Sequence, residues 1–283
     1  MRLFDCHSHW STRKGYIFRT EAELARQVEI WGTTPSYQTE DEMADYFRRN
    51  NARVILDLAW TKWLPIPEMK AYHDYAFDVQ RRHPDAIFGH WLIFDPRKGD
   101  EAVAEFQRCL SVAPGFVGIA VSGQGCHMPA SDPLWDPFYE ASIEAGTPVM
   151  ILTGLTGIGQ GLPGGLGQIL DHGHPRHIDE VAARFPELRI LAGRPAYPWQ
   201  DEMIAVLLHK GNVSYELHGW SPRRFSPELK KEIKGRLQDR VMFGCDFPVL
   251  HYETVVSRYR EEYSDEVIQK VLHDNAARYF NAK

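Results

Sequence analysis

The segments Asp5-Cys6-His7-Ser8-His9 and Phe243-Gly244-Cys245-Asp246-Phe247-Pro248 lie near the two ends of the chain, and each coincides with the end of a short strand-forming run. Side chains two residues apart on a strand point to the same side, so His7 and His9 are predicted to project together from one strand tip. If the chain closes into a parallel barrel, its first and last strands are neighbours. Asp246 then lies beside the two histidines.

Two imidazoles and one carboxylate that meet in this way form a facial ligand set for a divalent metal, with coordination positions left open for chemistry. A His-X-His pair alone is also common as an ordinary polar strand end. The distant Gly-Cys-Asp-Phe-Pro segment makes the metal interpretation the better one. The sequence therefore predicts a catalytic metal bound by His7, His9 and Asp246.

Short β-branched or apolar runs alternate with longer amphipathic stretches along the whole chain. The predicted strands are residues 3–7, 53–58, 87–94, 116–121, 148–152, 188–192, 212–217 and 240–245. The clearest predicted helices are residues 40–49, 67–82, 101–110, 133–145, 178–185 and 202–210. Eight strand–helix units predict an α/β fold, a (β/α)8 TIM barrel with its active site at the carboxyl ends of the strands. A doubly wound sheet is the main alternative, but no glycine-rich phosphate fingerprint follows the first strand.

Composition agrees with one barrel domain over residues 1–283. A net charge of −6 argues against nucleic acid as a partner. No apolar stretch is long enough to span a bilayer and no signal-peptide pattern is present, so no membrane is expected. The four cysteines show no paired spacing, which favours a reduced, cytoplasmic protein.

Two segments are predicted to cross the barrel mouth. Residues 10–37 are long and mixed in polarity. Residues 154–167 are rich in glycine and are interpreted either as a mobile lid or as a loose surface loop.

The chain resembles the amidohydrolase-2 branch of the metal-dependent hydrolase superfamily, which includes aminocarboxymuconate-semialdehyde decarboxylase and related hydrolases, decarboxylases and hydratases. The resemblance implies a distorted TIM barrel, often a homodimer, usually with one zinc or manganese. It implies a metal held by the two strand-1 histidines, a strand-5 histidine and the strand-8 aspartate, with a strand-6 histidine assisting catalysis. Besides the two terminal segments, it rests on Asp132-Pro133-Leu134-Trp135-Asp136-Pro137, Ala145-Gly146-Thr147-Pro148-Val149, His174-Pro175, Arg184-Phe185-Pro186-Glu187-Leu188 and Tyr197-Pro198-Trp199.

Two of the histidines that the resemblance implies are replaced. Leu152 stands at the strand-5 position and Arg194 at the strand-6 position. Leucine cannot bind a metal, and arginine stays protonated, so it serves neither as ligand nor as general base.

Strand 7 offers replacements, because Glu216 and His218 lie on one face beside strand 8. They are interpreted either as ligands of a second metal or as a structural carboxylate with a supporting histidine. His172 is a further candidate for the lost strand-5 ligand. His90 and His127 are expected to be wall residues.

The expected partner is a small molecule, and the expected catalytic residues are Asp246, Arg194 and His218. Arg194 is predicted to bind a substrate carboxylate, and a rim of tryptophans to bind its apolar part. The preferred hypothesis is a non-heme iron oxygenase, with one or two irons, that hydroxylates an apolar carboxylate or its ester. The alternatives are a zinc- or manganese-dependent hydrolase or decarboxylase of a small cyclic or aromatic carboxylate, and a non-catalytic binding barrel. The predicted aromatic rim comprises Trp10, Tyr16, Trp60, Trp63, Trp91, Trp199 and Trp220, of which Trp10, Trp60, Trp63 and Trp199 are the predicted substrate contacts.

Overall fold

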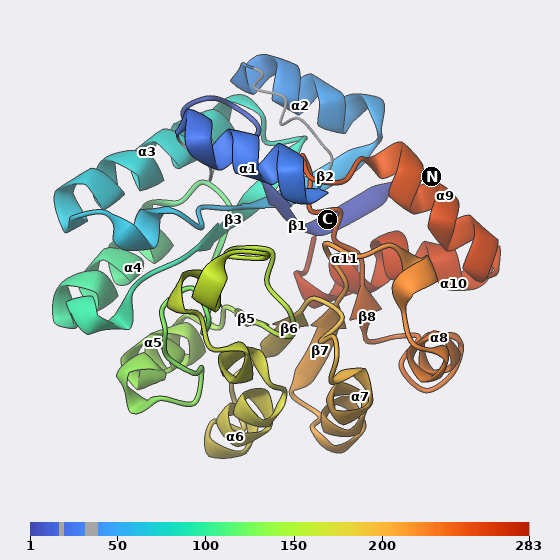
Figure 1. The fold of residues 1–283 in the computed structure, drawn as a ribbon. Coiled ribbons are helices and arrows are strands. Elements are labelled where there is room, and N and C mark those ends of the chain that lie inside the picture. Colours follow the sequence, from blue (N-terminus) through green and yellow to red (C-terminus); the bar gives the residue numbers. More distant parts are fainter. Residues whose placement is uncertain (17–19, 32–38, 283) are drawn as a thin grey trace.

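Eight parallel strands form one sheet in chain order, β1 to β8, in a computed structural model that describes residues 1–16, 20–31 and 39–282 (Figure 1). No helix in this described part of the chain is long and apolar enough to cross a membrane. The strands are β1 Leu3–His9, β2 Ala52–Asp57, β3 Ile87–Leu92, β4 Phe116–Val121, β5 Val149–Leu152, β6 Ile190–Gly193, β7 Val213–Glu216 and β8 Val241–Met242.

The sheet curls round until its two edges meet. Beyond the short strand β8, the chain continues alongside β1 and exchanges backbone hydrogen bonds with it. Cys6 N donates to Phe243 O at 2.9 Å, and Asp246 N donates to His7 O at 3.0 Å. These bonds bring the two chain ends together, and the predicted TIM barrel is confirmed.

Helices between the strands cover the outside of the barrel (Figure 1). The bounds of α2 are the predicted ones, and Thr39 caps this helix by accepting a hydrogen bond from Glu42 N. The helices are α1 Glu21–Trp31, α2 Glu40–Arg49, α3 Ile66–Arg82, α4 Asp100–Val112, α5 Asp136–Ala145, α6 Arg176–Arg184, α7 Gln200–His209, α8 Pro227–Lys234, α9 Tyr252–Glu262, α10 Asp265–Gln269 and α11 Asn275–Tyr279.

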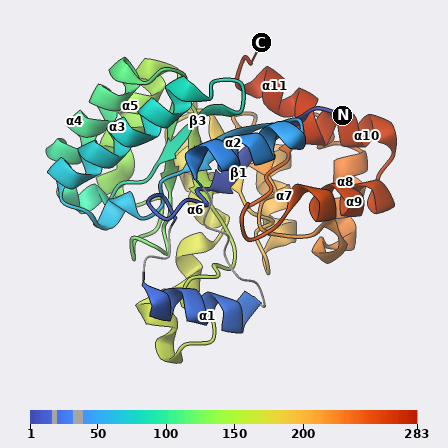
Figure 2. The ribbon, with the colours of Figure 1, turned by 90° about the horizontal axis from the view of Figure 1, so that it is seen from above.

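Helix α1 stands away from the barrel, beside the glycine-rich segment that follows β5 (Figure 2). Arg26 Nη2 on α1 donates to Gln160 O at 3.5 Å. The two predicted excursions, residues 10–37 and 154–167, therefore contact each other. Residues 17–19 and 32–38 of the first excursion lie outside the described residues.

The barrel interior is filled with apolar side chains, and its amino-terminal end is closed. Phe4, Trp91 and Met150 belong to one buried cluster inside the barrel. Phe280, which follows α11, stacks on Phe4 with ring centroids 5.6 Å apart. Burial of each such side chain contributes roughly 2 kcal/mol to folding. Access to the interior is therefore left to the carboxyl ends of the strands.

Candidate metal centre and active site

The buried carboxylate of Asp5 ties β1 to the segment that follows β8. Asp5 Oδ1 accepts hydrogen bonds from the backbone N–H groups of His7 and Cys245, each at 3.0 Å. Asp5 Oδ2 accepts from Ser8 Oγ and Tyr252 Oη, each at 2.6 Å. The register between β1 and β2 shifts between Asp5 and Ser8, where the chain turns from barrel wall to barrel mouth. Asp5 thus positions both halves of the predicted ligand set.

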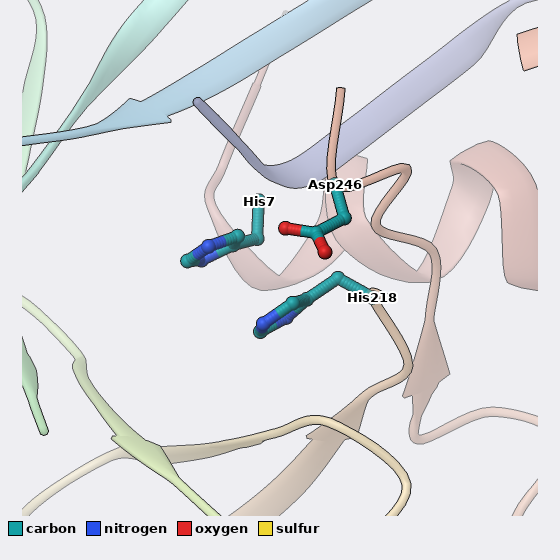
Figure 3. Close-up of side chains that lie close together, drawn as sticks. All are labelled: His7, His218 and Asp246. Carbon is teal, nitrogen blue, oxygen red and sulfur yellow. The ribbon is translucent and has the colours of Figure 1, made fainter. Parts of the chain in front are cut away.

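His7, His218 and Asp246 meet at the barrel mouth (Figure 3). One ligand-type atom from each of the three lies within 4.8 Å of the others. The rings of His7 and His218 are nearly parallel, with centroids 3.7 Å apart. Burial lowers the pKa of His7 to about 4 and that of His218 well below its usual value. Both imidazoles are therefore neutral at pH 7, the form that binds metal.

A second cluster shares His7 and adds His9 and Asp57. His9 lies between two carboxylates, with Nδ1 2.6 Å from Asp57 Oδ1 and Nε2 2.9 Å from Asp246 Oδ1. Burial alone would lower the pKa of His9, but Asp57 and Asp246 raise it to about 10. Burial opposes ionisation of both carboxylates, but the contact with His9 outweighs it, and their pKa values are lowered.

Asp57 was not among the predicted site residues. It ends β2, and the register of the sheet pairs it with His9. The sequence did offer a signal for Asp57, because an acidic residue ends the predicted strand that neighbours the His-X-His strand.

Glu216 lies fully buried at the end of β7 and contacts His218 Nδ1 through Oε2. Burial, together with the charges of Asp5 and Asp246, raises the pKa of Glu216 well above its usual value. Its other oxygen, Oε1, has no hydrogen-bond partner among the described residues. A Cβ at Gly244 would lie 1.8 Å from Glu216 Oε1, so only glycine permits the close approach of the segment after β8 to the end of β7.

Leu152 and Arg194, which replace the two expected histidines, end β5 and begin the segment after β6. Both line the same cavity. Arg194 has a φ of 73° and Asp246 a φ of 66°, a left-handed conformation that costs roughly 1–3 kcal/mol in a residue other than glycine. Arg194 Nε donates to His218 Nε2 at 3.1 Å. Two of the predicted catalytic residues, Arg194 and Asp246, are therefore held in a strained backbone conformation. The third, His218, is held by its hydrogen bond with Arg194.

These residues fit a divalent metal. Neither ring nitrogen of His7 has a hydrogen-bond partner in the described part of the chain, although both are buried. A neutral imidazole with a free nitrogen, beside ionised carboxylates, is a metal-type donor set. His7 can bind an ion as it stands, whereas His9, which lies between Asp57 and Asp246 and holds its proton, must first lose that proton. The predicted set of His7, His9 and Asp246 stays a prediction. His218 can join them only if its nitrogen gives up the contact with Arg194.

A cavity of about 320 Å³ opens above these groups. The first part of the glycine-rich segment, including Leu155 and Ile158, forms one of its walls, which agrees with the predicted position over the barrel mouth. The charged or titratable lining residues include His9, Asp57, Lys62, Arg194 and Asp246, and the aromatic ones are Tyr16 and Trp220. Lys62 was not predicted either, because a single lysine after a strand carries no pattern.

None of the four tryptophans predicted to bind substrate lines this cavity. Trp10 is buried against His90, and Trp60 Nε1 donates to Gly15 O at 2.9 Å. Trp63 is 56 % exposed, and Trp199 packs on His174. Large apolar side chains close to a barrel mouth can pack into its walls or lie on the surface as readily as face its centre, and these four tryptophans do not face it.

The remaining histidine candidates lie apart from the ligand clusters. His172 belongs to the short 3-10 turn Leu170–Gly173 and is absent from every ligand-type group found among the described residues. His90 is buried, with Nδ1 3.2 Å from Gln80 Oε1, and behaves as the expected wall residue.

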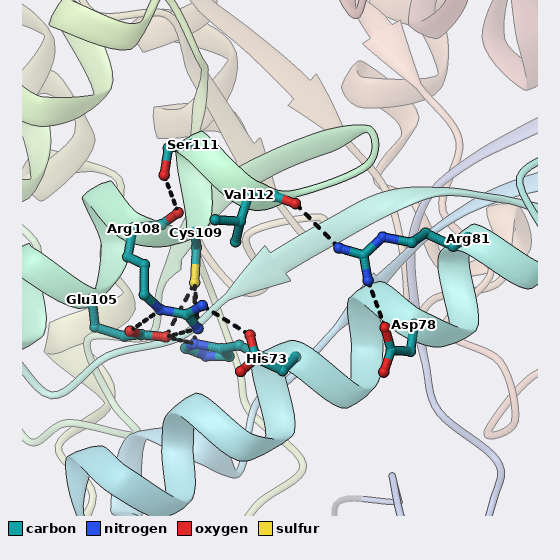
Figure 4. Close-up of polar contacts among 9 residues, drawn as sticks. His73, Asp78, Arg81, Glu105, Arg108, Cys109, Ser111 and Val112 are labelled. Carbon is teal, nitrogen blue, oxygen red and sulfur yellow. Dashed lines mark hydrogen bonds and ion pairs between the residues drawn. The ribbon is translucent and has the colours of Figure 1, made fainter.

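One further group of ligand-type residues lies between α3 and α4, on the outside of the barrel (Figure 4). His73 Nδ1 is 2.7 Å from Glu105 Oε1, and Cys109 Sγ is 3.3 Å from His73 Nδ1. Arg108 Nε donates to Glu105 Oε2 at 2.7 Å. The guanidinium already neutralises the carboxylate, and burial raises the pKa of the Cys109 thiol far above its usual value. This cluster therefore acts as a polar contact between two helices.

The chain is similar to several characterised proteins. It is 23 % identical over 177 residues to 2-keto-4-carboxy-3-hexenedioate hydratase from Sphingobium sp., a match that spans about half of each chain. Its fold matches 5-carboxyvanillate decarboxylase from Sphingomonas paucimobilis with a TM-score of 0.70 and 17 % identity, covering 100 % of this chain and 99 % of that one. It also matches 5-carboxyvanillate decarboxylase from Novosphingobium aromaticivorans, complexed with manganese, with a TM-score of 0.65 and 16 % identity, covering 99 % and 96 % of the two chains.

These three proteins are named as one hydratase and two decarboxylases, and none is named as an oxygenase. The comparisons therefore do not support the iron oxygenase hypothesis. A divalent metal agrees with both the relatives and the ligand clusters. None of the three proteins is named with iron. Assembly as a homodimer and a cytoplasmic location stay predictions. The amidohydrolase family model matches residues 4–282, nearly the full length, and the chain therefore belongs to the amidohydrolase family.

Proposed function

We propose that this protein is a metal-dependent decarboxylase of a small cyclic or aromatic carboxylate. The observation that carries the proposal is the position of Arg194, which lines the cavity beside the ligand cluster where a base would otherwise stand. A guanidinium matches a carboxylate in two-point geometry and does not take up a proton.

The lining of the cavity suits such a substrate. Apolar side chains, including Ile93, Leu152 and Leu155, surround the polar floor. A cavity of about 320 Å³ is at the small end of the range for ligand pockets, which favours a single ring over a longer chain.

Decarboxylation depends less than hydrolysis on the two histidines that Leu152 and Arg194 replace. Hydrolysis needs a water nucleophile and a base that directs it, and Leu152 and Arg194 provide neither. In decarboxylation the bond between the carboxyl carbon and the ring breaks, carbon dioxide leaves, and the electron pair stays on the ring carbon. A proton from the site then forms the new C–H bond. Arg194 orients the departing carboxylate, and a divalent metal, when bound, polarises the substrate as a Lewis acid.

His7, His9 and Asp246 are the residues that we assign to the metal. We assign zinc or manganese, because imidazole and carboxylate ligands suit both. His218 is held by Glu216 and Arg194, so we assign it a positioning role unless a second ion displaces Arg194.

The test uses purified protein with either metal and a panel of ring carboxylates labelled with ¹³C at the carboxyl group. The expected result is labelled carbon dioxide, together with a product that carries one deuterium when the reaction runs in D₂O. A product that keeps the labelled carbon and gains ¹⁸O from labelled water would instead identify a hydrolase or hydratase. Oxygen gained from labelled dioxygen, with no turnover under anaerobic conditions, would overturn the proposal in favour of an oxygenase.

A further inference from the structure

Lys62 is a buried cation in the wall of the active-site cavity. It lies in the short turn Thr61–Trp63 after β2 and is 2 % exposed. Its ammonium donates to Ala59 O and lies 4.0 Å from the centre of the Trp63 ring. Gly125 leaves room for its stem, because a Cβ there would lie 3.2 Å from Lys62 Cε. These contacts hold the lysine in one place without neutralising its charge.

Neither Lys62 nor Arg194 has an acidic partner. Over residues 1–16, 20–31 and 39–282, no carboxylate oxygen lies within 4 Å of either cation. The two carboxylates that line the cavity, Asp57 and Asp246, are both paired with His9. Burying an unpaired cation is costly, so two of them in one cavity indicate that an anionic ligand completes the site.

The two cations lie on opposite sides of the barrel mouth. Lys62 follows β2 and Arg194 follows β6, and these strands are four apart in the ring of eight. The metal-ligand cluster comes from β1, β7 and β8, on a third side of the cavity. A ligand that pairs with both cations therefore needs an anionic group towards each side of the mouth.

We propose that Lys62 binds a second carboxylate of the substrate, so that this site takes a cyclic dicarboxylate. The inference rests on the proposed function, in which Arg194 orients the carboxylate that reacts. Lys62 then contacts the group that stays on the product and selects dicarboxylates over monocarboxylates.

The experiment measures binding by isothermal titration calorimetry, on metal-loaded protein at pH 7. The probes are benzene-1,3-dicarboxylate and benzoate, which share one ring and differ by one carboxylate. We expect the wild type to bind the dicarboxylate 10- to 100-fold more tightly, as befits one charge-assisted hydrogen bond. Lys62→Met should remove this preference and leave benzoate binding unchanged. Lys62→Arg, which keeps the charge, should retain part of it.

The matched control is Lys70→Met, on the exposed face of α3, which should bind both probes as the wild type does. Equal binding of the two probes by the wild type would overturn the inference. So would an equal loss of both in Lys62→Met, with the fold checked by circular dichroism. Carbon dioxide release from monocarboxylates alone would refute the role of Lys62 and leave the decarboxylase proposal standing. If the protein prefers dicarboxylates but releases no carbon dioxide, the role of Lys62 stands and the decarboxylase proposal is refuted.

Discussion

Replacing Lys62 with methionine should make the ligand-free protein more stable at pH 7. Burial lowers the pKa of this lysine from 10.5 to about 8, although Asp57, Asp95 and Cys126 oppose the shift and Arg194 adds to it. At 1.36 kcal/mol for each factor of ten in protonation, the charged lysine costs the folded state ~3 kcal/mol. Methionine has a similar length and no charge. It also gives up the hydrogen bond to Ala59 O, worth about 1–2 kcal/mol.

The net gain is roughly 1–2 kcal/mol at pH 7, which corresponds to a rise of about 2–6 °C in Tm for a chain of this size. The gain should depend on pH. Between pH 8 and pH 10.5 the unfolded chain binds more protons at this lysine than the folded one, so wild-type stability rises relative to the variant. Above pH 10.5 neither state is protonated and the advantage of Lys62→Met should disappear.

The assay is thermal unfolding of wild type, Lys62→Met and Lys70→Met, without ligand, at pH 7 and near pH 10.5. Lys70 is exposed, so its variant should follow the wild type at both values. A Lys62→Met protein that is less stable than wild type at pH 7 would refute the reasoning. An advantage of equal size at both pH values would also refute it, because only the lysine charge links the effect to pH.

Four other variants test the metal centre. His7→Ala and Asp246→Ala should each remove bound metal from folded protein, as measured by elemental analysis, and full occupancy in either would exclude that residue as a ligand. Glu216→Gln should halve the metal content if β7 supplies a second ion, whereas unchanged stoichiometry would assign the carboxylate to positioning. Gly244→Ala should lower both metal content and Tm, because its Cβ would lie 1.8 Å from Glu216 Oε1. Gly211→Ala, where no atom lies within 4 Å of the new Cβ, should have little effect.

The barrel fold and the metal-ligand candidates His7 and Asp246 were predictable from the sequence because they depend on local patterns. Apolar runs with regular spacing fixed the eight strands, and closure of such a barrel brings His7 and Asp246 together whatever the loops do. Asp57 was not predicted, although the order of the strands makes β2 the neighbour of β1. Only the register between these two strands, which pairs Asp57 with His9, was still needed.

Side-chain direction after a strand end was not predictable in the same way. Trp63 and Lys62 are adjacent in the sequence, yet the tryptophan is exposed and the lysine is buried in the cavity wall. Both positions depend on long-range packing, such as the room that Gly125 leaves in the loop after β4. No periodicity in the sequence records a contact of that kind.

The two replaced histidines change the charge balance of the site more than its shape. A histidine at the position of Arg194 could accept a proton and direct a water molecule, whereas arginine keeps a fixed positive charge beside His218. That charge helps to keep His218 neutral, and it attracts anions to the cavity. Lys62 adds a second fixed charge on the opposite wall. A site with two cations, and with no base at the positions of Leu152 and Arg194, favours binding a carboxylate over activating water, and this preference is the physical basis for assigning decarboxylation.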